Sequence, residues 1–251
     1  MYLKYTHLLI LAVMTLSTPA SLLLLFLLSL GSPDWRPRIQ DFIPQGQTYR
    51  TLENCLRLTE DEPYSAGSIW YKHAVNLRKP FSFKLMIKAG CDDAGGADGM
   101  VFVMTPQRSQ TGYVGEGQGF AGLVPSMGIE IDTWQNNHLY DPPEDHLALM
   151  FHGRVGHYYQ ITQPYKIKNI EDCKRHSFGV SWDPVAKWLS VKLDSKEIIS
   201  KNIDLIQDVF QGKSYVYWGM TAATGRASNV HEVCFEWGDR KLPPEIEKLV
   251  R

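Results

Sequence analysis

Short runs in which apolar and polar side chains alternate recur along the chain between about residues 50 and 240. In residues 81–88, FSFKLMIK, large apolar side chains alternate with polar or flexible neighbours, the pattern of a strand with one buried face. Residues 99–104, GMVFVM, are apolar throughout and predict a strand covered on both faces. Further strands are predicted at residues 146–152, 157–163, 176–182, 187–193, 215–221 and 230–237.

Helical periodicity is limited to two short segments, residues 204–210 and residues 243–251. Many short strands separated by Gly, Pro, Asn and Asp are typical of two antiparallel sheets packed as a sandwich or jelly roll. No break in composition divides residues 50–240, which we interpret as one domain followed by a C-terminal tail, residues 241–251. Residues 32–49 are rich in Pro and polar side chains and predict a linker or an irregular lead-in strand.

The N-terminus differs from this pattern. Residues 8–30 contain no charged side chain and follow Lys4, which is the order of a signal peptide. Ser29 and Gly31 form an acceptable cleavage site, so residues 1–31 predict a signal peptide. The same apolar run is also long enough to span a bilayer as an anchor. Both interpretations predict an exported protein that is secreted, periplasmic or anchored with its domain outside the cytoplasm.

Charge and cysteine content narrow the classes of function. The formal net charge is -1 and both signs are interspersed, so no basic stripe favours a nucleic-acid partner. The four cysteines include no CxxC pair: Cys55, Cys91, Cys173 and Cys234. Their spacing does not suit zinc, and in an exported chain an even number of cysteines predicts disulfides, with three connectivities open.

Residues 129–146, IEIDTWQNNHLYDPPEDH, gather polar side chains directly after an apolar strand pattern. They are three carboxylates, an amide and an imidazole: Glu130, Asp132, Asn136, Asp141 and His146. Glu130 and Asp132 are two residues apart on the predicted strand and share one face. Buried carboxylates are costly unless a positive charge compensates them. Carboxylate, amide and carbonyl oxygens suit calcium, and carboxylates with imidazole suit manganese or another transition ion.

This segment resembles the L-type, legume-type or concanavalin-like lectins, which carry Glu-x-Asp-Thr-aromatic-x-Asn followed by Asp and His. The resemblance implies a concanavalin-like jelly-roll sandwich in a bacterial-like member of the family. It implies Ca²⁺ held by Asp132, the Trp134 main-chain carbonyl, Asn136 and Asp141. It also implies Mn²⁺ or another transition metal held by Glu130, Asp132, Asp141 and His146.

Two other segments resemble sugar-binding loops of the same lectins. In residues 94–104, AGGADGMVFVM, Asp98 matches the family's acid that accepts hydrogen bonds from sugar hydroxyls and follows a cis peptide bond. Residues 112–122, GYVGEGQGFAG, resemble the glycine loop, in which main-chain N–H groups approach the sugar closely because no Cβ intervenes. Gly115 and Gly117 are the candidates for this role.

Residues 221–237 resemble the family's specificity loop and last strand, with Gly225 and Arg226 lining the site. The resemblance implies that Asn136 donates to sugar hydroxyls, and we expect the Trp134 ring to stack on the apolar face of the pyranose. These residues predict a metal-dependent lectin that binds glycans and is not an enzyme. A shallow site binds one sugar weakly, so several copies, as in a homo-oligomer, are expected to strengthen binding.

Two alternatives stay open from the sequence. Residues 130–135, EIDTWQ, superficially match the Glu-Ile-Asp-x-x-Glu strand of laminarinase-like glycoside hydrolases on the same fold. Those enzymes need two carboxylates, and Gln135 cannot transfer a proton. A non-binding structural or adhesion module that keeps the metals for stability is the other alternative. The sequence does not identify the sugar, although the resemblance makes mannose or glucose a mild default.

Overall fold

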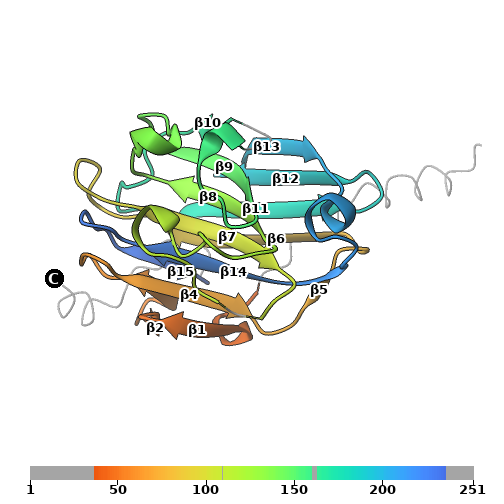
Figure 1. The fold of residues 1–251 in the computed structure, drawn as a ribbon. Coiled ribbons are helices and arrows are strands. Elements are labelled where there is room, and N and C mark those ends of the chain that lie inside the picture. The colour runs from red at the N-terminus through yellow and green to blue at the C-terminus, as the bar shows by residue number, and fades with distance from the viewer. Residues whose placement is uncertain (1–36, 109, 160–162, 236–251) are drawn as a thin grey trace, which may run out of the picture. The chain divides into compact units, whose positions relative to one another are not determined.

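A computed structural model describes residues 37–108, 110–159 and 163–235. These residues form two antiparallel sheets packed as a sandwich, which confirms the predicted fold (Figure 1). The eight-stranded sheet has the order β1-β4-β14-β7-β8-β9-β10, with β5 paired to β14. Its strands are β1 (Phe42–Gly46), β4 (Ala66–Tyr71), β5 (Val75–Asn76), β7 (Gly99–Thr105), β8 (Met127–Asp132), β9 (His146–Phe151), β10 (Tyr165–Lys166) and β14 (Tyr215–Ala223).

The seven-stranded sheet has the order β13-β12-β11-β6-β15-β3-β2. Its strands are β2 (Tyr49–Arg50), β3 (Cys55–Thr59), β6 (Phe81–Lys88), β11 (His176–Asp183), β12 (Trp188–Leu193), β13 (Lys196–Asn202) and β15 (His231–Cys234). Short helical turns in the described residues are η1 (Ile39–Asp41), η2 (Gly115–Gly117), η3 (Asn137–Leu139), η4 (His157–Tyr159) and the π-helical η5 (Leu205–Val209). The turn η5 lies within the helical segment predicted at residues 204–210.

Apolar side chains from the inner faces of both sheets form the core. Phe83 of β6 stacks on Trp218 of β14, with ring centroids 4.4 Å apart, and Phe102 of β7 packs against both rings. Strand β6 buries every second side chain from Phe83 onward, as its alternation predicts. Since the rings come from opposite sheets, this cluster fixes the two layers against each other.

Strand β7 is buried along its whole length, as its continuous apolar sequence predicts. Its inner face packs on the seven-stranded sheet, while Val101 and Val103 face a second apolar cluster that includes Phe120 and Leu123. The chain that follows η2 therefore covers the outer face of β7. This packing holds the glycine loop over the strand that begins directly after Asp98.

Two predictions about elements need correction. Residues 157–163 were predicted as a strand, but His157–Tyr159 form the 3-10 turn η4, and residues 160–162 lie outside the described ones. Strand β1 begins at Phe42 and pairs with β4, so the sandwich includes residues before residue 50. Pro44 fits there because β1 is an edge strand, where a missing N–H disturbs the ladder least.

Both chain termini carry predictions that fall outside the described residues. The signal peptide or anchor at residues 1–31, with its apolar run at residues 8–30, lies outside them, as does the helical segment at residues 243–251. Within the described ranges, no helix is long and apolar enough to cross a membrane.

The four cysteines form two disulfides, which resolves the open connectivity. Cys55 pairs with Cys234 across the neighbouring strands β3 and β15, and Cys91 pairs with Cys173. Disulfides persist mainly in oxidising compartments, so they suggest a protein that folds outside the cytoplasm.

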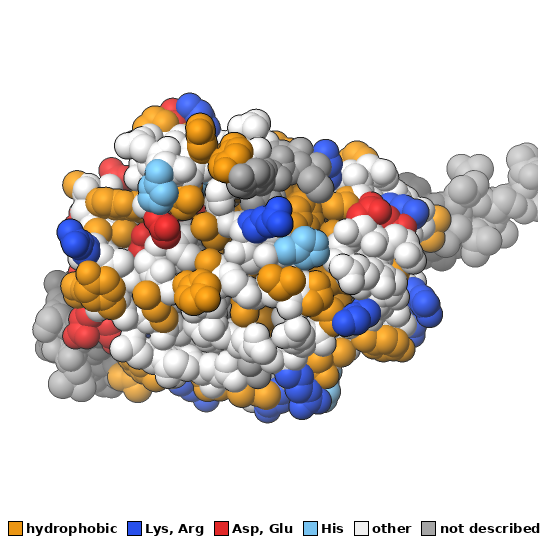
Figure 2. All heavy atoms as spheres, viewed as in Figure 1, with side chains coloured by type: hydrophobic (Ala, Val, Ile, Leu, Met, Phe, Trp, Pro, Cys, Tyr) orange, Lys and Arg blue, Asp and Glu red, His pale blue; other side chains and the backbone are white. Residues whose placement is uncertain are grey.

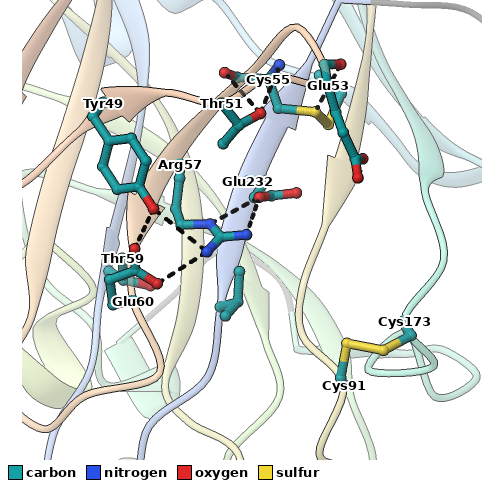
Figure 3. Close-up of polar contacts among 12 residues, drawn as sticks. Tyr49, Thr51, Glu53, Cys55, Arg57, Thr59, Glu60, Cys91, Cys173 and Glu232 are labelled. Atoms are coloured by element: carbon teal, nitrogen blue, oxygen red, sulfur yellow. Dashed lines mark hydrogen bonds and ion pairs between the residues drawn. A yellow bond between two sulfur atoms is a disulfide. The ribbon is translucent and has the colours of Figure 1, made fainter. Parts of the chain in front are cut away.

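An ion-pair network lies beside the Cys55–Cys234 disulfide on β3 and β15. In Figure 3 the Arg57 guanidinium points between Glu60 and Glu232, donating from Nε to Glu232 Oε1 at 2.8 Å and from Nη1 to Glu60 Oε2 at 3.0 Å. Burial disfavours the charged guanidinium, but the hydrogen bond and charge of Glu232 outweigh it and raise the pKa of Arg57. Glu232 is itself buried, so its carboxylate depends on this partner.

Replacing Glu232 with alanine is expected to lower the free energy of unfolding by about 1–3 kcal/mol, because a partly buried guanidinium loses its main partner. Chemical denaturation at neutral pH measures the change. Lys174→Ala is the matched control, since the Lys174–Asp172 pair is exposed and such pairs contribute less than about 1 kcal/mol. An equal loss in both variants would contradict the prediction.

Candidate functional site

Two neighbouring strands and the loop between them carry the side chains of the candidate metal centre. Strands β8 and β9 run antiparallel with Asp132 opposite His146. Glu130 precedes Asp132 by two residues on β8, so both side chains leave the same face of the sheet. The four side chains predicted to hold the transition ion are all buried: Glu130, Asp132, Asp141 and His146. His146 Nε2 lies 3.7 Å from Glu130 Oε2.

A histidine that the sequence analysis did not select joins this cluster. His157, in η4, is buried, and its Nε2 lies 3.2 Å from Glu130 Oε2, 3.1 Å from Asp141 Oδ1 and 3.2 Å from His146 Nε2. No sequence spacing marks His157 as a ligand, because an irregular segment separates η4 from β9. Only the tertiary structure brings His157 beside Glu130.

The loop after β8 is held by hydrogen bonds to two of the acids. Trp134 N donates to Asp132 Oδ1 at 2.7 Å, and Asn136 N donates to Asp141 Oδ2 at 2.7 Å. The other Asp132 oxygen, Oδ2, accepts from Gln118 Nε2 at 2.5 Å. Gln118 is a further residue that the sequence analysis missed, and it links the end of η2 to the candidate metal centre.

The acids destabilise one another in their ionised forms. Burial, and then the charge of Asp141, raises the pKa of Glu130 well above its usual value. Burial, and then the charges of Glu130 and Asp141, raise the pKa of Asp132 well above its usual value. Burial and the neighbouring His157 lower the pKa of His146 to about 4, so its ring is neutral at pH 7 and can act as a ligand.

The donor set fits the two ions that the family resemblance implies. Two buried oxygens at this site, Glu130 Oε2 and Asn136 Oδ1, accept no hydrogen bond from the described residues. An oxygen buried without a donor is costly, and a cation would satisfy it. The cluster of carboxylates, amide and neutral imidazole is therefore suited to hold calcium and a transition ion.

Asp98 lies at the start of β7, next to the loop after β8. The Ala97–Asp98 peptide bond is cis, as the resemblance implies. The backbone of Asp98 is fixed on both sides, since its N–H donates to the Ala223 carbonyl and its carbonyl accepts from Thr133 N, both at 3.2 Å. Its Oδ2 is buried and accepts no hydrogen bond from the described residues. Burial and the charge of Glu116 raise the pKa of Asp98 to about 7.

Two glycines leave space beside the Asp98 carboxylate. A Cβ on Gly225 would lie 3.2 Å from Asp98 Oδ2 and 3.6 Å from the Gly115 Cα. The Gly115 N–H donates to the Thr224 carbonyl at 3.2 Å, which ties the glycine loop to the loop after β14. The structure therefore brings Asp98, Gly115 and Gly225 together.

The remaining predicted sugar-site residues have different surroundings. Gly117 is buried, a Cβ on it would meet the Tyr113 Cβ at 3.1 Å, and its N–H donates to the Val114 carbonyl at 3.3 Å. The main-chain N–H groups of Gly115 and Gly117 both donate to carbonyls of this chain. What these two glycines contribute to the loop is therefore the absence of a side chain. Trp134 and Arg226 are exposed.

A buried amide and acid support the loop that leads to Asp98. Asn229 Nδ2 donates to Glu171 Oε1 at 2.7 Å and to the Asp92 carbonyl at 3.1 Å, and Cys91 N donates to Asn229 Oδ1 at 3.0 Å. A Cβ on Gly96 would lie 2.0 Å from Asn229 Nδ2, so a glycine is required there. Burial raises the pKa of Glu171 to about 8. The sequence analysis did not identify either supporting residue.

Solved structures share this fold. The metal-free form of lectin I-B4 from Griffonia simplicifolia is 23% identical, with a TM-score of 0.66, and the match covers 77% of this chain and 90% of that one. The Bauhinia forficata lectin in complex with GalNAc is 19% identical, with a TM-score of 0.65 and the same two coverages, 77% and 90%. Lectin II from Ulex europaeus is 18% identical, with a TM-score of 0.66 and coverages of 80% and 92%.

Sequence comparison gives a distant bacterial relative and a family. The chain is 29% identical over 160 residues to the pesticidal crystal protein Cry22Aa of Bacillus thuringiensis. The match covers 62% of this chain and 20% of that protein. The chain thus spans about a fifth of the length of this bacterial relative. The family model of the legume lectin beta-barrel domain matches residues 40–237, and the chain therefore belongs to that L-type lectin family.

Proposed function

We propose that the protein is a metal-dependent lectin that binds glycans at the site formed by Asp98 and the loops around it. The observation that carries the proposal is the buried Asp98 carboxylate, whose Oδ2 has no hydrogen-bond donor in the described part of the chain and adjoins Gly225. A sugar hydroxyl would supply the missing donor. A carboxylate fixed in advance binds hydroxyls with little loss of side-chain freedom.

The proposed calcium ligands are Asp132, the Trp134 carbonyl, Asn136 and Asp141. The proposed transition-ion ligands are Glu130, Asp132, Asp141 and His146. The bound ions would neutralise these buried acids and so stabilise the loop between β8 and β9. That loop carries Asn136 and Trp134, which are proposed to contact the sugar through the amide and the indole ring.

The other proposed contacts follow from space and position. The absence of side chains at Gly115 and Gly225 lets a sugar approach Asp98, and Gly117 shapes the same loop from within. Arg226 is exposed directly after Gly225 and is proposed to influence which sugar binds. The Bauhinia forficata lectin was solved with GalNAc, which supports testing galactose-type sugars beside mannose and glucose.

The two disulfides support the proposal that the protein is exported, with residues 1–31 as a signal peptide or as an anchor. One shallow site is expected to bind a monosaccharide in the millimolar to high-micromolar range, roughly -4 to -6 kcal/mol. Several sites in a homo-oligomer would raise the avidity for a multivalent glycan.

The alternative of a laminarinase-like hydrolase finds less support in the geometry. The Glu130 carboxylate, which would have to attack the sugar, is buried and faces His146 and His157. The second acid of that mechanism is replaced by Gln135. The solved neighbours named above are lectins, which supports a binding protein over an enzyme.

Glycan-array binding with and without chelator tests the proposed function. We expect binding in the presence of Ca²⁺ and Mn²⁺, loss of the signal after chelation and recovery when both ions are restored. A metal-loaded protein that binds no immobilised glycan would contradict the proposal and favour a structural or adhesion module. Turnover of a β-glucan would instead favour the hydrolase.

A further inference from the structure

Ligand atoms of Glu130, His146 and His157 lie within 4.8 Å of one another at the buried end of the candidate metal centre. The close approaches involve Glu130 Oε2, His146 Nε2 and His157 Nε2, and Asp141 Oδ1 also lies beside His157 Nε2. The distances that join His157 Nε2 to the other three atoms are 3.2, 3.1 and 3.2 Å. The Glu130 and His146 atoms are 3.7 Å apart.

The separations from His157 Nε2 match the spacing of atoms that share one metal ion, and the Glu130–His146 separation is slightly longer. Ligands about 2.0–2.2 Å from a transition metal lie about 3.0–3.5 Å from one another. A single N–H···N hydrogen bond can join the two Nε2 atoms at 3.2 Å, but it leaves the neighbouring carboxylates without a compensating positive charge. Glu130 Oε2 is also left without a hydrogen-bond donor among the described residues.

The contacts of the His146 ring favour the same assignment. His146 Nδ1 lies 3.3 Å from the Glu144 carbonyl, so a proton on Nδ1 leaves the Nε2 lone pair free to bind a metal. His157 lies closer to the acids of the cluster than the predicted ligand His146 does.

We propose that His157 is a direct ligand of the transition ion and that this second imidazole makes the site prefer Zn²⁺ to Mn²⁺. Imidazole binds zinc well, whereas manganese favours carboxylates and water. Two imidazole nitrogens and the Glu130 carboxylate also supply three of the four ligands that zinc commonly takes, and Asp141 or a water could supply the fourth. The inference rests on the metal-binding part of the proposed function and does not depend on which sugar binds.

Metal competition on the full-length protein tests the inference. The protein is stripped with chelator, saturated with Ca²⁺, and dialysed against equal concentrations of Zn²⁺ and Mn²⁺, and bound metal is measured by mass spectrometry. The wild type is expected to retain one Zn²⁺ per chain at this site. In His157→Ser the Zn²⁺ affinity and the Zn²⁺-to-Mn²⁺ ratio are each expected to fall at least about tenfold.

His73→Ser is the matched control, because it removes an exposed imidazole outside the cluster and should leave the metal ratio unchanged. Equal Zn²⁺ affinity in the wild type and His157→Ser would overturn the inference, as would a wild type that retains Mn²⁺ in preference or binds neither ion. Circular dichroism establishes that each variant is folded.

A measurement on the wild type alone covers the case in which His157→Ser does not fold. X-ray absorption of the Zn²⁺-loaded protein is expected to show two imidazole ligands, and a single imidazole would overturn the inference. Glycan binding is measured separately. A protein that binds Zn²⁺ through His157 but binds no glycan would contradict the lectin proposal and leave the metal assignment standing.

Discussion

Replacing Asp98 with alanine is expected to lower the affinity for every bound glycan by at least about 100-fold, because hydrogen bonds to a charged group contribute about 1.5–3 kcal/mol each. The carboxylate is buried at the start of β7, and no donor in the described part of the chain satisfies its Oδ2. The sugar would lose its best-placed acceptor. Asp98→Asn keeps the size of the side chain and is expected to lose most of the affinity too. Titration calorimetry with a glycan identified on the array measures both effects.

Asp208→Ala, which removes an exposed carboxylate of the turn η5, is the matched control and should leave glycan affinity unchanged. The melting temperature and bound calcium of each variant show whether the fold and the metal centre are intact. Undiminished glycan binding by a folded Asp98→Ala protein would contradict the prediction and show that the sugar binds elsewhere.

The metal-free protein is expected to lose stability as the pH rises above 6.5, the ordinary histidine pKa, because the buried Glu130 and Asp132 then ionise without a cation. Over the same range the protein saturated with Ca²⁺ and Mn²⁺ should lose much less. At ion concentrations of about 100 times Kd, binding adds about 2.7 kcal/mol, or roughly 5–10 °C in Tm. Thermal melts at several pH values, with and without chelator, measure the gap between the two forms, and a gap that does not widen with pH would contradict the prediction.

The sign follows from the direction of each pKa shift. Glu130 and Asp132 have pKa values raised by burial first and by neighbouring acids second. A carboxyl group with a higher pKa in the folded protein stabilises the fold below its unfolded value, and this contribution is lost as pH rises through the folded value. Two histidines with lowered pKa values, His146 and His231, oppose this trend only below about 6.5. Bound cations favour the ionised acids and bind better as pH rises.

Local patterns predicted most strands because burial imposes a period on the sequence. The continuous apolar run of β7 and the alternation in β6 needed no knowledge of their partners. Residues 157–159 were predicted wrongly, since apolar and aromatic side chains in a short segment do not distinguish a strand from a turn that buries one side chain. Pro44 pointed to an irregular segment, and only the edge position of β1 explains how a strand accommodates it.

Some residues of the candidate site could likewise be predicted from local sequence, and others could not. The acids of β8 and the loop after it lie within one short segment, so their spacing could be compared with a family. His157, Gln118 and Asn229 reach the site from other parts of the chain, through contacts that depend on how η4, the end of η2 and the loop after β14 pack. Such contacts leave no periodic signal in one sequence.

The Cys91–Cys173 bond closes a covalent ring of chain, with a sequence separation of 82, that contains every side chain proposed to hold an ion. Such a ring restricts the conformations of the unfolded chain. Even when the two sheets have come apart, Glu130 and His157 stay within a limited distance of each other. The effective local concentration of the ligands therefore remains high, which favours recapture of an ion by an oxidised chain over a reduced one.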